Sequence, residues 1–167
     1  MALETIFEKN SRALAESFDA ALQQALKMYE GLRLAGEKGK LSHAYISFLS
    51  SGVSCRSPWL RLDLYDERDR DDLTECFAYW DVPQIAEKLY ADAALAAKEA
   101  GIREEYRLEQ AWLDSMDVYA SAFGRILPQI IGQSKSAQAA KCRWYFGQYL
   151  GNAALVHDGG GKQDGLL

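Results

Sequence analysis

The sequence has little of what disulfide-rich, metal-binding or membrane proteins need. Its 167 residues include three cysteines, and these form no C-x-x-C pair, so neither a disulfide framework nor a zinc site is expected. The chain has acidic residues among its first ten and has no apolar run long enough for a signal peptide or a membrane-spanning helix. We therefore expect a cytoplasmic protein with reduced thiols and no membrane contact.

Positive charge is also scarce, since the formal net charge is −5. A protein that binds nucleic acid or an anionic membrane needs a basic stripe. The nearest approach to one is formed by Lys135, Lys141 and Arg143, which we interpret as the exposed start and face of a helix rather than as a phosphate site. Nucleic acid is therefore not an expected partner.

The chain is rich in helical periodicity. Apolar residues recur at steps of three and four, and they predict helices over residues 3–35, 82–100, 102–132 and 136–156. The length suits a single domain over residues 1–157, followed by a flexible tail over 158–167.

The first of these helices is unusually long. Its seam consists of Phe7, Leu14, Phe18, Ala21, Ala25, Met28 and Leu32. A helix of about 30 residues is about 45 Å long, more than one side of a domain this size can cover. We therefore expect it to pack against a second copy of the chain, in a homodimer.

Residues 43–83 form the stretch that does not read as helix, and two strands are predicted within it. Tyr45–Leu49 and Trp59–Tyr65 suit an antiparallel β-hairpin over residues 44–66, with alternate leucines of the second strand facing inward. The predicted fold is α+β and mainly α, with a long N-terminal helix, this hairpin, and three later helices packed as a bundle on it.

The outward face of the hairpin is the candidate binding site. Its members are Trp59, Arg61, Asp63, Tyr65 and Tyr45. Tryptophan, tyrosine and arginine are the residue types that most often anchor binding surfaces. The alternative carries equal weight: helices cover both faces, Arg61 pairs with Asp63 or another acid, and the aromatic residues belong to the core.

A catalytic site is the second hypothesis. Cys55 and Arg61 have the spacing of the tyrosine phosphatase loop, and His43 could act as a base toward the thiol. The match is weak, because Pro58 removes a backbone amide and no glycine separates the two residues. We therefore interpret Cys55 as an ordinary residue of the hairpin loop.

The acidic run from Asp63 to Glu75 resembles a cation site only in composition. Arg68 and Arg70 interrupt it, and it lacks the central glycine of a calcium loop. We predict a solvated acidic turn or a short helix, without metal.

Together these features predict a small, acidic, non-catalytic binding or regulatory protein without a cofactor. It would bind a protein partner or a small ligand through the aromatic and arginine face or through a helical groove. The alternative is a small enzyme with a site of Cys55, His43 and Arg61. An enzyme predicts a pocket with convergent polar groups, whereas a binding module predicts an exposed apolar patch or groove.

Overall fold

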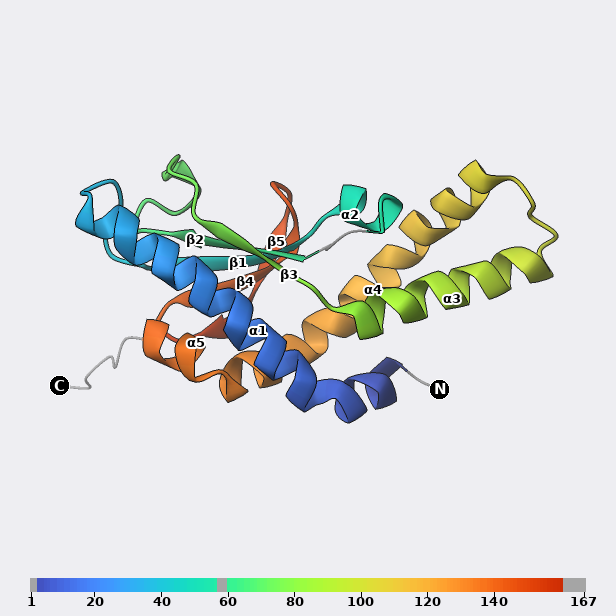
Figure 1. The fold of residues 1–167 in the computed structure, drawn as a ribbon, viewed down its shortest axis with the longest axis horizontal. Coiled ribbons are helices and arrows are strands. Elements are labelled where there is room, and N and C mark those ends of the chain that lie inside the picture. The colour runs from blue at the N-terminus through green and yellow to red at the C-terminus, as the bar shows by residue number, and fades with distance from the viewer. Residues whose placement is uncertain (1–2, 57–59, 161–167) are drawn as a thin grey trace.

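A layer of helices packs against one face of a β-sheet (Figure 1). The computed structural model describes residues 3–56 and 60–160. The elements are α1 (Leu3–Leu34), β1 (His43–Phe48), α2 (Ser50–Ser54), β2 (Leu60–Tyr65), the 3-10 turn η1 (Asp69–Asp71), β3 (Phe77–Trp80), α3 (Pro83–Glu99), α4 (Glu105–Gln133), α5 (Lys135–Ala140), β4 (Arg143–Gln148) and β5 (Ala153–Asp158). The predicted class, α+β and mainly α, is confirmed.

The sheet has five strands in the order β3-β2-β1-β4-β5. β1 and β2 form the expected antiparallel pair, with Ile46 opposite Leu62. β1 also pairs with β4 in parallel, and the chain reaches β4 by way of α3, α4 and α5. The N-terminal ends of β1 and β4 therefore lie side by side, and so do their C-terminal ends.

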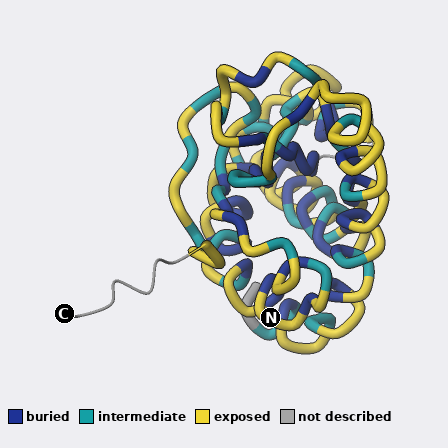
Figure 2. Tube along the Cα trace, turned by 90° about the vertical axis from the view of Figure 1, so that its left-hand side faces the viewer, coloured by how far each residue is buried: buried dark blue, intermediate teal, exposed yellow. Residues whose placement is uncertain are grey.

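The core lies between the sheet and helices α1 and α4. Strand alternation turns Leu60, Leu62 and Leu64 toward these helices, and all three are buried. Phe18 of α1 packs against Trp80 and Trp144, with ring centroids 5.0 and 5.5 Å apart. Figure 2 shows the buried part of the trace on the inside of this arrangement and the exposed part around it.

The seam of α1 is covered within the same chain. Phe7, Leu14 and Phe18 are buried against the sheet and α4, while Met28 is exposed and Tyr29 is buried in its place. Much of the seam is therefore covered within the same chain, and the homodimer through this helix stays a prediction. The reason is that five strands together with α4 and α5 offer far more area than the two predicted strands.

The prediction of a last helix over 136–156 is wrong. α5 ends at Ala140, Lys141 adopts a left-handed conformation with φ 49°, and β4 and β5 follow as an antiparallel pair. The turn between these strands contains Leu150, which is also left-handed at φ 54°. Gly147 has no room for a side chain, since a Cβ there would lie 2.0 Å from the carbonyl oxygen of Asn152. β3 was also missed.

α3 and α4 form a helical hairpin that extends away from the sheet (Figure 1). Their bounds are close to the predicted 82–100 and 102–132. Gly101 separates them with a positive φ of 69°, a conformation that glycine adopts without strain. Of the predicted tail, Asp158 belongs to β5, and residues beyond 160 lie outside the described part of the chain.

Candidate functional site

The predicted hairpin residues gather on the sheet face opposite α1 and α4. Tyr45 of β1 lies opposite Asp63 of β2, and Arg61 and Tyr65 share this face. Trp59 lies outside the described residues. Loops cover the face: the β2–β3 loop meets the β4–β5 turn, where Arg70 donates to the carbonyl oxygen of Gly151 at 2.8 Å.

Arg61 is held at the centre of this face. Its guanidinium lies 3.8 Å from the ring centroid of Phe77 and 4.7 Å from that of Tyr149. It forms an ion pair of 2.7 Å with Asp63, whose side chain is 6% exposed, and a longer one of 3.4 Å with Glu75. Burial raises the pKa of Asp63, and Arg61 opposes that rise. The positive charge of Arg61 is therefore already balanced by carboxylates of the same chain.

Tyr45 is similarly enclosed. Its ring stacks on Tyr145 at 4.7 Å, and Arg70 lies 4.5 Å from its centroid. The Tyr45 hydroxyl donates to Asp69 at 3.1 Å, and burial together with this bond raises the pKa of Tyr45. The described members of the predicted site thus form a packed layer. This agrees with the alternative interpretation, in which Arg61 pairs with Asp63. A binding role for them stays a prediction.

The structure does not assemble the catalytic alternative. His43 begins β1, whereas Cys55 follows α2 beyond the other end of this strand, which is about 16 Å long. Figure 1 shows α2 beside the α3–α4 hairpin, far from the loop that enters β1. Arg61 is paired with Asp63 rather than turned toward either residue.

All three cysteines are free thiols. Cys55 is exposed, whereas burial raises the pKa of Cys76 to about 11 and that of Cys142 to about 12. The two buried thiols are therefore protonated near neutral pH, and they pack as part of the hydrophobic core.

The acidic run is partly internal, so the prediction of a solvated turn is wrong for Asp63, Asp66 and Asp72, which are buried. The side chains of Lys38 and Asp72 are fully buried and form an ion pair, and Lys38 also donates to the carbonyl oxygen of Leu64 at 3.2 Å. Arg68 binds Asp66 at 2.6 Å and holds the pKa of this buried carboxyl well below its usual range. Lys38 is the cation that balances the buried carboxylate of Asp72, and the sequence pattern gives no sign of this pairing.

A groove lies between α4 and the β4–β5 pair on the helical side of the sheet. Its volume is about 410 Å³, and it opens to solvent. Apolar or small residues form its floor: Phe48, Ala120, Gly124, Phe146, Ala154 and Val156. Asp117, Ser121 and Arg125 of α4 form its rim.

Small residues on both walls create this groove. A Cβ at Gly124 would lie 3.1 Å from the ring of Phe146, so glycine allows α4 to approach β4 closely. Ala120 on α4 and Ala154 on β5 are too short to fill the space beside that contact. No sequence pattern revealed the groove, because its residues come from four separate elements.

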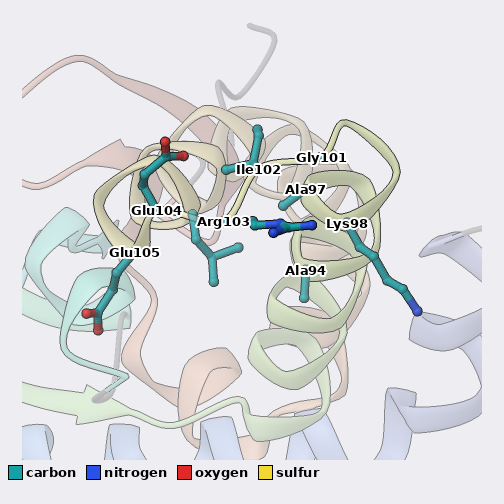
Figure 3. A pocket seen from close by; sticks show the side chains of 9 residues that line it. Ala94, Ala97, Lys98, Gly101, Ile102, Arg103, Glu104 and Glu105 are labelled. Carbon is teal, nitrogen blue, oxygen red and sulfur yellow. The ribbon is translucent and has the colours of Figure 1, made fainter.

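A second pocket, of about 320 Å³, lies at the tip of the α3–α4 hairpin (Figure 3). Its charged residues are Lys98, Arg103, Glu104 and Glu105, two of each sign. In Figure 3, Lys98 points away from the two glutamates, so the charges do not converge on a common point. This pocket offers no arrangement of groups for chemistry.

Comparison of the chain with models of protein families, with curated protein sequences and with solved structures finds no match in any of the three. Within the described residues, no group of three or more His, Cys, Asp or Glu side chains could hold a metal ion. In that same part of the chain, no helix is both long and apolar enough to cross a membrane.

Proposed function

We propose that this chain is a non-catalytic binding protein whose site is the groove between α4 and β5. Its occupant is an extended apolar segment of a partner protein. The observation that supports this best is an open apolar groove beside an edge strand that contains neither lysine nor proline.

The shape of the groove suits a segment of a protein. It is shallow and opens broadly to solvent, whereas small-molecule sites enclose most of their ligand. Its floor is apolar, so filling it with one or two apolar side chains removes both surfaces from water.

β5 supplies the backbone for such a segment. It is an edge strand, paired with β4 among the described strands. Natural proteins usually guard edge strands with lysine, proline, a bulge or short length. β5 has six residues, its sequence AALVHD contains neither lysine nor proline, and its Leu155 is 52% exposed. Its pairing with β4 is irregular between Leu155 and His157, so the regular part of the edge is Ala153–Leu155. An added strand could pair with this edge while its alternate side chains enter the groove.

The rim gives the partner a direction. Asp117 and Arg125 are eight residues apart on α4, about 12 Å along the helix, which three to four extended residues can span. A segment with a cation at the Asp117 end is therefore complementary to the groove.

A fluorescent, end-blocked peptide tests this proposal. It alternates valine and threonine between a terminal lysine and a terminal glutamate, and its binding is followed by fluorescence anisotropy. We expect saturable binding that Ala154→Lys weakens by tenfold or more, because the new side chain fills the groove. Leu95→Lys, a matched change at an exposed site on α3, should leave the affinity unchanged.

Two further observations separate the outcomes. A peptide with proline at two successive central positions lacks an amide that would donate to β5, whichever side of the strand faces it, and should bind much more weakly. Absence of saturable binding, or equal affinity in the Ala154→Lys and Leu95→Lys variants, would overturn the proposal.

A second copy of the chain is the other occupant to consider, in a homodimer through β5 rather than through α1. Light scattering distinguishes it from a separate partner. A mass near 18.7 kDa supports a separate partner protein. Twice that mass, lost in Ala154→Lys, would mean that the groove is filled by a second copy instead.

A further inference from the structure

A positively charged pocket lies at the opposite end of β1 and β4 from the groove. Its volume is about 250 Å³. Lys40, His43, Lys141 and Arg143 line it together with Ser42 and a single carboxylate, that of Glu67. We propose that this pocket binds a phosphate group, as the dianion of a small phosphate monoester.

The fold brings these residues together from three separate segments. The left-handed turn at Lys141 ends α5 and leads the chain into β4, whose first residue is Arg143. In the parallel register Arg143 lies opposite His43 of β1, so the two side chains share one face of the sheet. Lys40 comes from the loop that enters β1. The expectation that Lys141 and Arg143 lie on a solvated helix face is wrong, because the helix ends before them.

Three cations line this pocket against one carboxylate, although the chain as a whole carries −5. The carboxylate of Glu67 is already engaged, since its two oxygens accept from the backbone N–H of Lys40 at 3.1 and 3.2 Å. Arg143 has a carboxylate neighbour in Asp158, but the separation is 3.9 Å. The positive charge of Lys40, Lys141 and Arg143 therefore exceeds its local compensation.

The ring of His43 is fixed in orientation. Its Nδ1 lies 3.1 Å from the carbonyl oxygen of Asp66, and because a carbonyl oxygen only accepts, Nδ1 carries the hydrogen. Nε2 is then an acceptor in the neutral ring and a donor in the imidazolium. A protonated His43 can therefore add a hydrogen bond to a phosphate oxygen.

The size and charge of the pocket select the ligand class. A volume of 250 Å³ is below the range of about 300 to 1,000 Å³ typical of drug-sized sites, so it suits a small head group rather than a whole nucleotide. Three cations favour a dianion over a monoanion, and the arginine fork matches phosphate oxygens.

Calorimetric titration of the full chain with O-phosphoserine at constant ionic strength tests this proposal. Saturable binding is expected, and Arg143→Gln should weaken it about tenfold through loss of a charge-assisted hydrogen bond. Lys135→Gln removes an exposed lysine outside this pocket and should leave the affinity unchanged. Circular dichroism checks that each variant is folded.

Glu67→Gln gives a result that misfolding cannot produce. The amide oxygen can still accept from the Lys40 N–H, but the negative charge is gone, so O-phosphoserine should bind about threefold more tightly. Inorganic phosphate that binds as tightly as O-phosphoserine would show that the free ion is sufficient, whereas tighter O-phosphoserine would assign the site to monoesters. The proposal is overturned by no saturable binding, by acetate binding equally well, or by equal losses in the Arg143 and Lys135 variants.

Discussion

At the residue scale, Arg61 shows how a side chain of a type common in binding sites can serve the fold. It is paired with the buried Asp63 and lies between the rings of Phe77 and Tyr149. Because these partners belong to the same chain, Arg61 supports the loops that cover this face of the sheet.

Arg61→Ala should therefore destabilise the protein about as much as Leu62→Ala. The first leaves Asp63 buried without its cation, at a cost of about 3 kcal/mol or more. The second opens a cavity in the core, at a cost of about 2 to 5 kcal/mol. Urea denaturation measures both. An Arg61→Ala variant within about 0.5 kcal/mol of the parent, as for an ordinary surface substitution, would show that Arg61 is free to meet a partner.

Asp66 makes the stability of the folded protein depend on pH. Its hydrogen bond from Arg68, together with those from the backbone of Gly39 and Arg68, lowers its pKa in the folded state. A lowered pKa contributes stability that is present above the unfolded value, about 3.9, and is lost as the pH falls toward the folded value. Asp66→Asn should thus be less stable than the parent at pH 7, and urea denaturation should show the difference shrinking below about pH 4. A difference that stays constant with pH would contradict this assignment.

At the element scale, a substitution at Gly147 distinguishes the strand β4 from the helix that the periodicity predicts. The two structures give Gly147→Ala opposite effects on stability. In a helix, Gly147→Ala would stabilise the protein by up to about 1 kcal/mol. In the hairpin the new Cβ collides with the backbone of Asn152, so the melting temperature should fall.

Gly132→Ala is the matched control. Gly132 lies within α4 and has open space around it, so alanine there should be neutral or stabilising by up to about 1 kcal/mol. A rise in melting temperature for Gly147→Ala as well would contradict the β4–β5 pairing.

The elements differ in how far the sequence predicts them. α1, α3 and α4 are long enough for a three-four period to be unambiguous, and the leucine alternation of β2 is equally clear. The spacing of Cys142, Tyr145, Phe146 and Tyr149 fits a helix, but the alternation around Phe146 fits a strand. Pairing with β1, far earlier in the chain, decides between them, and no local pattern contains that information.

The candidate sites also show that the sequence predicts local features but not contacts between distant segments. The sequence placed Arg61, Asp63 and Tyr65 on one face, because alternation within one strand is local. The groove and the positively charged pocket each combine residues from distant segments, so the sequence predicts the residues of neither. The ion pair of Lys38 with Asp72 is hidden for the same reason.

At the scale of the whole molecule, the two faces of the sheet are covered differently. Helices α1 and α4 cover one face, whereas loops linked by Arg70 cover the other. The helical cover is incomplete beside β5, which leaves the groove at one end of the parallel pair β1 and β4. The positively charged pocket lies at the opposite end of this pair, so the two sites can be tested independently.

Amide hydrogen exchange of β5, followed by NMR with and without saturating peptide, tests the proposed binding site most directly. If the peptide adds a strand, exchange should slow at amides of Ala153–Asp158 that point away from β4, while the amides of β1 keep their rates. The Ala154→Lys variant should show no such slowing. Unchanged exchange throughout β5, or slowing confined to the face that carries Arg61, would contradict a binding site at the β5 edge.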